Sequence, residues 1–285
     1  MKLKAWAKLN LNLHLIPQKM GNGFYPVKFI NCELDLFDEI FLKNIKDKIR
    51  IIADNPELPD HVNNSVYKAA FLLKKHLNNQ QLGVKIILKK RIPIKAGLAG
   101  GSSDGAATLK ALIKLWQAKI TDNQLFAIIN KLGKDVFYSY QGEVCEVSGD
   151  GSNISKLNLK MPRIPIIIIT PIEKKPSTRF MYKQLNKKEI GKHLDRFDNL
   201  KKALAKSDKK KIIEQLHNDF EITILNQFPI IKKIKNDLRE AGALNTLVAG
   251  SGLSVVGFFK NNIEAQNGFN LLKNNYKNIY YGHTR

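Results

Sequence analysis

The chain has 285 residues, of which 44% are hydrophobic, so it is long enough for two domains with packed cores. Its 47 Lys and Arg residues outnumber its 25 Asp and Glu residues, which gives a formal net charge of +22. Cys32 and Cys145 exclude a disulfide framework and show no metal-binding pattern, so no metal ligand is expected and a reducing cytoplasm is favoured. No secretory signal is visible, and the apolar run over residues 164–170 is too short to span a membrane.

The positive charge leaves two classes of protein open. The lysines are spread along the chain, with one denser region over residues 201–211, and they accompany no RNA-binding motif or zinc finger. This distribution favours a solvated lysine-rich surface, and a nucleic-acid-binding protein remains the alternative. A surface of this kind also attracts polyanionic small molecules such as ATP.

The first predicted element is a strand. Residues 8–15 alternate between apolar and polar side chains, which predicts a half-buried strand with Lys8 and Asn10 on one face. The spacing of apolar residues then predicts, in order, a strand, a turn and a strand over 27–44, a helix over 65–77, a strand over 84–88, and a helix from Ala106 to Trp116.

The next helix carries start and stop signals. Thr121 and Gln124 form a capping box, and Gly133 fits the position after the helix end. A new strand begins near residue 162, so we expect one domain over residues 1–160 and a second over 161–285. The second is expected to contain a lysine-rich helical region over 196–222, a helix over 229–241, a hairpin over 244–259, and a helix from Asn262. This mixed order predicts an α+β fold.

The most informative segment is rich in glycine and runs over residues 93–104. Its glycines let backbone N–H groups approach a ligand, and Ser102 and Ser103 add hydroxyl groups. A glycine-rich turn that opens a helix is suited to bind an anion such as a nucleotide phosphate. No lysine precedes the serines, so the segment is not a Walker A loop. An ordinary connection with a serine cap is the alternative.

The order of residues in this segment resembles the second motif of the GHMP small-molecule kinases, whose loop wraps the ATP phosphates. Residues 7–13, 132–136, 218–221 and 249–257 are also similar to that family. The resemblance implies a two-domain GHMP kinase fold, with a ribosomal-protein-like βαβ core in the N-terminal domain and a ferredoxin-like C-terminal domain. It also implies ATP with Mg²⁺, bound by Pro93, Gly97, Leu98, Ala99, Gly100, Gly101, Ser102, Ser103, Asp104, Asn64 and Lys90.

Three of these nucleotide contacts have ordinary alternatives. Asn64 is equally suited to cap a helix, Lys90 to lie on the surface, and Asp104 to occupy the first turn of a helix. No acidic Mg²⁺ ligand is identifiable in the sequence.

The resemblance also implies catalytic groups. Phosphoryl transfer requires positioning and charge neutralisation. A carboxylate can accept the proton of the attacking alcohol, and a lysine can stabilise the charge that develops on phosphate. The family positions imply Asp135 and Lys8 in these roles, paired with each other and supported by Asn10. Taken alone, Asp135 suits a turn and Lys8 suits an exposed surface.

The implied substrate is a small molecule. The branch of the family that the chain most resembles phosphorylates the 2-hydroxyl of a cytidine diphosphate-linked methylerythritol, an isoprenoid precursor. Phe24 and Tyr182 would stack around the pyrimidine, and Tyr25 stands where the family has a histidine. Because of Tyr25, a homoserine-like or mevalonate-like alcohol remains an alternative substrate. A non-catalytic ligand-binding homologue is a second alternative, and the intact Lys8, Asp135 and glycine loop argue against it. The implied substrate contacts are Phe24, Tyr25, Thr178, Tyr182, Gly250 and Gly252, in a monomer or homodimer.

Overall fold

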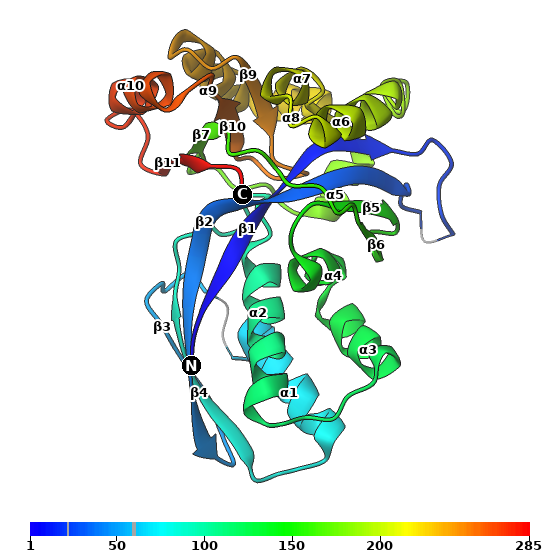
Figure 1. Cartoon of the computed structure of the whole chain (residues 1–285), viewed down its shortest axis with the longest axis vertical. Helices are drawn as coiled ribbons and strands as arrows, with labels where there is room; N and C mark the ends of the chain where they lie inside the picture. Colours follow the sequence, from blue (N-terminus) through cyan, green and yellow to red (C-terminus); the bar gives the residue numbers. More distant parts are fainter. Residues whose placement is uncertain (22, 59–60) are drawn as a thin grey trace. The chain divides into compact units, whose positions relative to one another are not determined.

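The computed structural model describes residues 1–21, 23–58 and 61–285, which form two compact units (Figure 1). Unit 1 comprises residues 1–7, 36–94 and 99–141, and unit 2 comprises residues 8–35, 95–98 and 142–285. The units are discontinuous in sequence because strands β1 (Lys2–Leu15) and β2 (Val27–Lys46) contribute to both. The sequence predicts a boundary at residue 160 between an N-terminal and a C-terminal domain, and this boundary stays a prediction.

Unit 1 packs helices beside a sheet. In it β2 pairs antiparallel with β4, and β4 pairs in parallel with β3. Helices α1 and α2 lie side by side, and α4 packs on α2 (Figure 1). The elements are β3 (Ile49–Ala53), η1 (His61–Asn63), α1 (Ser65–Leu77), β4 (Leu82–Lys89), α2 (Gly100–Leu115), α3 (Asp122–Leu132) and α4 (Lys134–Gln141).

The helix predictions for this unit are confirmed, with one difference in length. Helix α1 spans the predicted residues, and the capping box of Thr121 and Gln124 is present at the start of α3. Helix α2 begins at Gly100, before the apolar residues that predicted it. Its first turns are made of small residues because α1 packs closely there: a Cβ added to Gly105 would lie 3.3 Å from the Cβ of Ser65.

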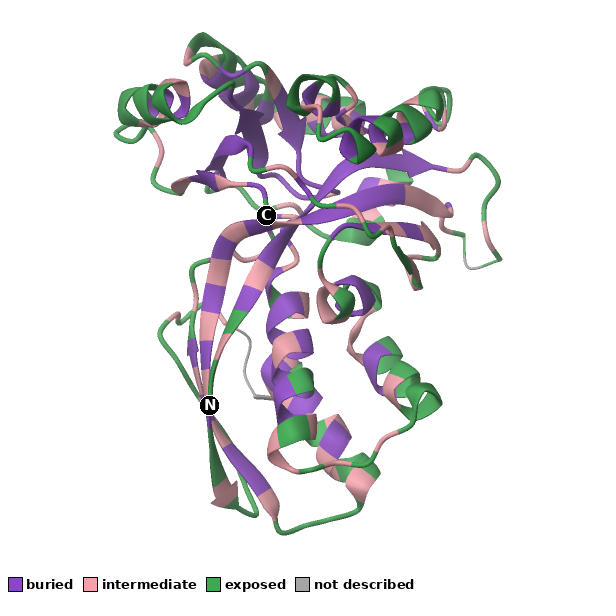
Figure 2. Cartoon of the chain, viewed as in Figure 1, coloured by how far each residue is buried: buried purple, intermediate pink, exposed green. Residues whose placement is uncertain are grey.

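Strand β2 is continuous over 20 residues, so the turn predicted within residues 27–44 is wrong. Alternate side chains are buried from Leu34 to Leu42, which Figure 2 shows as alternating bands along the strand. The alternation of burial with a period of two is therefore unbroken. Asp38 belongs to a residue type common in turns, but here it is fully buried and paired with Lys90.

Unit 2 contains a four-stranded antiparallel sheet in the order β11-β7-β10-β9. Elsewhere in the unit β5 pairs with β2 and with β6, and β8 pairs in parallel with β1. The elements are β5 (Cys145–Gly149), β6 (Asn153–Lys156), β7 (Pro165–Ile169), α5 (Thr178–Lys183), α6 (Asp195–Ala205), α7 (Lys209–Glu214), β8 (His217–Asn218), α8 (Glu221–Gln227), α9 (Pro229–Glu240), β9 (Asn245–Val248), β10 (Val255–Phe258), α10 (Asn262–Leu272) and β11 (Ile279–His283).

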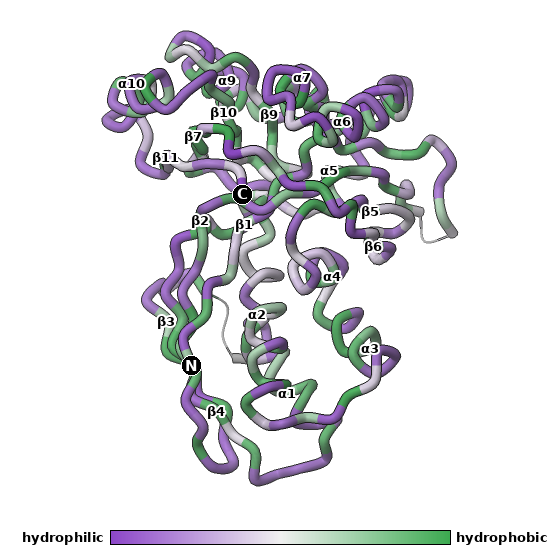
Figure 3. Tube along the Cα trace, viewed as in Figure 1, coloured by the Kyte–Doolittle hydropathy of each residue, from purple (hydrophilic) through white to green (hydrophobic). Residues whose placement is uncertain are grey.

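Strand β7 lies in the core of this unit. Pro165 and the four isoleucines that follow it are all buried, and β7 is purple in Figure 2. The isoleucines make most of this strand hydrophobic in Figure 3. The predicted hairpin is confirmed as β9 and β10, and the last two predicted helices are confirmed as α9 and α10. The lysine-rich region is helical in α6 and α7, but residues 217–218 form a strand because they pair with β1. Among the described residues, no helix has the length and apolar character needed to cross a membrane.

Candidate functional site

Two glycine-rich segments that are far apart in the sequence fit closely together in unit 2. Gly97 has φ 88°, and a Cβ added there would fall on the carbonyl group of Ala249. A Cβ added to Gly252 would fall on Ala96. The Ser254 N–H donates to the Ala96 carbonyl oxygen at 3.2 Å. Both glycines are therefore required by the close approach of two backbones.

The backbone of the first loop has the geometry of an anion site. Positive φ angles recur at Lys95 (59°), Gly97 (88°) and Ala99 (55°). Left-handed residues in such alternation turn N–H groups towards one side and favour anion binding. Ala99 is the N-cap of α2 and makes no side-chain capping hydrogen bond, so N–H groups at the start of α2 are suited to receive a phosphate.

The two serines of this segment differ in their surroundings. Ser103 is buried, and its hydroxyl donates to the carbonyl oxygen of Trp6 at 2.6 Å. Ser102 is only half-buried. Because the Ser103 hydroxyl is committed to the backbone, Ser102 is the better candidate for contact with Mg²⁺ or phosphate.

Lys90 belongs to a buried ion cluster in unit 1. Its side chain is 3% exposed, its Nζ lies 2.7 Å from Asp104 Oδ2, and it also pairs with Asp38. Asp38 further accepts a hydrogen bond from the Ile92 N–H at 2.9 Å. Burial raises the pKa of Asp104, and Lys90 opposes that rise. The alternative of a surface role for Lys90 is therefore wrong, and Asp38 is a partner that the sequence did not reveal.

Asn64 caps helix α1. Its side-chain oxygen accepts a hydrogen bond from the Val66 N–H at 3.1 Å, which confirms the capping alternative. The contact of Asn64 with a nucleotide stays a prediction.

Lys8 and Asn10 lie on the same face of β1, as the alternating pattern predicts. Lys8 Nζ donates to Asn10 Oδ1 at 2.8 Å, and Asn10 Nδ2 donates to Asn31 Oδ1 at 2.8 Å. Lys8 is 5% exposed, so a surface lysine is excluded. A Cβ added to Gly250 would lie 3.0 Å from Asn10 Oδ1 and 3.8 Å from Lys8 Nζ, so Gly250 keeps the space beside both groups open. Asn31 was not identified from the sequence.

Asp135 lies in the first turn of α4 and is exposed. Gly133, with φ 140°, ends α3, and α4 begins at the next residue. The alternative of a turn residue is therefore wrong. The pairing of Asp135 with Lys8 stays a prediction.

The aromatic residues expected at the substrate contact one another directly. The Phe24 and Tyr182 rings meet edge to face, with centroids 5.0 Å apart and planes at 81°, and Tyr182 meets Phe220 in the same way. This arrangement differs from the predicted pair around a pyrimidine, because a base between them would require parallel rings. Tyr25 is buried, and Lys19 Nζ lies 5.3 Å from the centre of its ring.

A polar cluster joins the start of α5 to the second glycine turn. Lys175 Nζ lies 3.2 Å from Thr178 Oγ1 and 2.5 Å from Ser251 Oγ. Asn218 Nδ2 donates to the carbonyl oxygen of Gly250 at 2.7 Å, which fixes the turn. Thr178 was predicted. Ser251 lies within the recognised glycine turn, whereas Lys175 is one of many lysines and carried no signal.

Known proteins are similar to this chain along its length. Residues 64–143 match the family model of the GHMP kinases N terminal domain, and residues 200–278 match that of the GHMP kinases C terminal domain. A 4-diphosphocytidyl-2-C-methyl-D-erythritol kinase of Clostridium tetani is 34% identical over 100% of both chains. A relative of the same name from Caldicellulosiruptor bescii is 35% identical over 96% of this chain and 94% of its own.

Solved structures agree with the sequence relatives. A 4-(cytidine 5'-diphospho)-2C-methyl-D-erythritol kinase superposes with a TM-score of 0.85 and 26% identity, over 100% of this chain and 99% of its own. A homoserine kinase from Cytophaga hutchinsonii superposes with a TM-score of 0.75 and 20% identity, over 100% of this chain and 94% of its own. The second similarity concerns the fold alone.

Proposed function

Because the chain belongs to the GHMP kinase family, we propose that it transfers the γ-phosphate of ATP to the 2-hydroxyl of 4-diphosphocytidyl-2-C-methyl-D-erythritol. This reaction serves the synthesis of isoprenoid precursors. The observation that carries the substrate assignment is the 34% identity, over the full length of both chains, to a relative named for this activity. Cys32 and Cys145 are both unpaired thiols, which suits the reducing cytoplasm where we place the enzyme.

The glycine loop fits the phosphates of ATP. Its positive φ angles and the start of α2 supply N–H groups, and Ser102 supplies a hydroxyl for the proposed Mg²⁺. When bound, Mg²⁺–ATP supplies the phosphoryl group and neutralises part of its negative charge. Lys90 and Asp104 support this loop through their buried ion pair rather than through an exposed charge.

Lys8 and Asp135 carry the two chemical roles that phosphoryl transfer requires. Asp135 orients the 2-hydroxyl of the substrate and accepts its proton. The Lys8 ammonium stabilises the negative charge that develops on the transferred group. Asn10 fixes the position of Lys8 through a 2.8 Å hydrogen bond, and Asn31 fixes Asn10 in turn. Burial of this chain of contacts makes the Lys8 position rigid.

The substrate is recognised by groups of unit 2. Cytosine stacks on the Phe24–Tyr182 pair, and the Tyr25 hydroxyl takes the place of the family histidine. Thr178 and the backbone at Gly250 and Gly252 contact the rest of the substrate. Lys175 holds Thr178 and Ser251 in place and adds a positive charge near the diphosphate.

A panel of alcohols tests this function. ADP release is measured with 4-diphosphocytidyl-2-C-methyl-D-erythritol, homoserine and mevalonate, each with Mg²⁺–ATP. We expect turnover with the cytidine-linked alcohol alone. Asp135→Asn, which keeps the size of the side chain, is expected to abolish turnover and to retain ATP binding. Faster turnover of homoserine or mevalonate would contradict the substrate assignment, and near-normal turnover of Asp135→Asn would remove this residue from the mechanism.

A further inference from the structure

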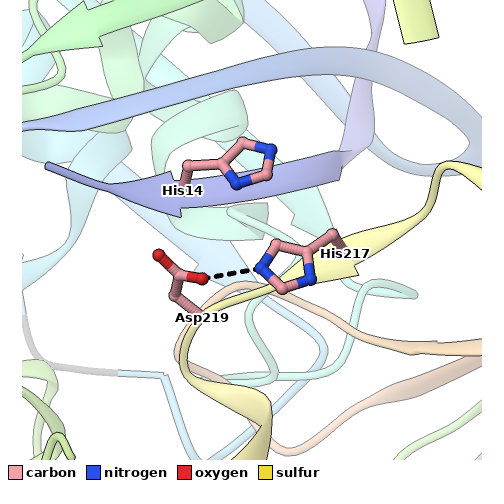
Figure 4. A group of neighbouring side chains, drawn as sticks. All are labelled: His14, His217 and Asp219. Atoms are coloured by element: carbon pink, nitrogen blue, oxygen red, sulfur yellow. Dashed lines mark hydrogen bonds and ion pairs between the residues drawn. The ribbon is translucent and has the colours of Figure 1, made fainter. Parts of the chain in front are cut away.

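Two histidines and an aspartate meet in unit 2 outside the residues assigned to catalysis. His14 lies on β1, His217 on β8, and Asp219 directly after β8. One ligand atom of each residue lies within 4.8 Å of the other two. The His14 and His217 rings are stacked, with centroids 4.8 Å apart and planes at 20°. Figure 4 shows a ring nitrogen of His14 facing the His217–Asp219 pair.

His14 lacks the hydrogen bonds that a buried imidazole requires. The side chain is fully buried, and neither ring nitrogen has a hydrogen-bond partner within the part of the chain that the structure describes. Buried polar atoms of this kind destabilise a fold unless a ligand satisfies them.

The carboxylate of Asp219 is held in a fixed orientation. Its Oδ2 accepts hydrogen bonds from the N–H groups of Leu15 at 2.7 Å and Gly191 at 3.2 Å. Its Oδ1 lies 2.6 Å from His217 Nε2. The two backbone contacts therefore direct Oδ1 towards the imidazoles, which is how outer-shell partners orient the ligands of a metal ion.

We propose that His14, His217 and Asp219 bind a divalent transition-metal ion of the Zn²⁺ class. Two imidazoles and a carboxylate are typical ligands of such ions, whereas Mg²⁺ prefers oxygen ligands. A tetrahedral Zn²⁺ ion with ligands about 2.0–2.1 Å away separates its ligand atoms by about 3.3 Å. The ligand atoms here are at most 4.8 Å apart, so small side-chain rotations bring them to that spacing.

His217 Nε2 faces Asp219 Oδ1, and the tautomer of His217 that carries its proton on Nδ1 presents the Nε2 lone pair to the ion. The exposed ring of His193 lies 5.1 Å from that of the half-buried His217, so the ion reaches the cluster from this side.

The ion stabilises the strand that carries Lys8. Strands β1 and β8 pair over only two residues on each strand. A metal held by His14 on β1 and by His217 on β8 adds a cross-link to this short pairing. Metal binding to the folded chain therefore raises Tm, and this effect is independent of kinase activity.

Equilibrium dialysis against Zn²⁺ tests the site. The untagged full-length protein is treated with EDTA, desalted, and dialysed in excess Mg²⁺. We expect one Zn²⁺ per chain and a higher Tm than with Mg²⁺ alone. His14→Gln and His217→Gln are each expected to weaken Zn²⁺ binding by more than about 100-fold, because losing a ligand exceeds the 10–100-fold effect of losing an outer-shell partner. His76→Gln, at an exposed histidine of unit 1, is the matched control and binds like the parent.

Two outcomes would overturn the proposal. The first is substoichiometric Zn²⁺ binding by the parent, and the second is equal Zn²⁺ affinity in the parent and both ligand variants. Circular dichroism establishes that the variants fold. His217→Gln keeps the test decisive if the buried His14→Gln does not fold, because His217 is partly exposed.

Discussion

Two buried lysines, one in each unit, are held in different ways. Lys90 pairs with the carboxylates of Asp38 and Asp104, and all three side chains are at most 3% exposed. Lys8 donates to the amide oxygen of Asn10, and the amide nitrogen of Asn10 donates in turn to the amide oxygen of Asn31. The Lys90 cluster contains two acidic groups and one basic group, so removing its cation leaves uncompensated charge in the core. The hydrogen bond from Lys8 to Asn10 is made to an amide, and it helps to set the position of the ammonium group.

We propose that this difference separates a structural lysine from one with a chemical role. Lys90 ties β2 to the start of α2 through its two acidic partners, so its main contribution is to the stability of unit 1. Lys8 lies beside Gly250, where a side chain would block the space next to its Nζ. Burial alone does not distinguish the two proposed roles, whereas the carboxylates beside Lys90 and the glycine beside Lys8 do.

The largest expected effect is on stability, from Lys90→Met. The substitution leaves two buried carboxylates without their cation, so we expect the free energy of unfolding to fall by about 3–5 kcal/mol. Urea denaturation followed by circular dichroism measures the change. Adding Asp38→Asn and Asp104→Asn to the same chain should restore part of the loss. Unchanged stability in Lys90→Met would show that the cluster is not structural.

A smaller effect, on turnover rather than on stability, is expected from Lys8→Met. Loss of the ammonium is expected to lower kcat by about 10²–10³, which corresponds to about 2.7–4 kcal/mol of transition-state stabilisation. Steady-state kinetics with the cytidine-linked alcohol measures it, and Lys4→Met, at an exposed position of the same strand, is the matched control. If Lys8→Met lowers stability as much as Lys90→Met and leaves kcat unchanged, the two lysines have the same role and the comparison fails.

Local patterns predicted the parts of the site that depend on local geometry. The period of two along residues 8–15 placed Lys8 and Asn10 on one face, and their hydrogen bond confirms it. The glycine-rich segment predicted a tight backbone, and Gly97 has the positive φ and close contact that this requires.

Partners that are distant in the sequence could not be predicted in this way. Asp38 is 52 residues before Lys90, and it lies in a segment where a turn was expected. The sequence pattern places His14 on the polar face of a predicted strand, and only the fold brings it close to His217 and Asp219. The sequence did not predict strand β11, because its apolar and polar residues do not alternate clearly. It forms a strand through its pairing with β7.

The most direct test of the account is phosphorus NMR of a complete reaction. The enzyme is mixed with Mg²⁺–ATP and 4-diphosphocytidyl-2-C-methyl-D-erythritol, and the products are followed until ATP is consumed. We predict a new phosphomonoester resonance in an amount equal to the ADP formed, with no matching rise in inorganic phosphate, because the phosphoryl group passes to the 2-hydroxyl. Formation of ADP with inorganic phosphate alone, or no consumption of ATP, would contradict the account.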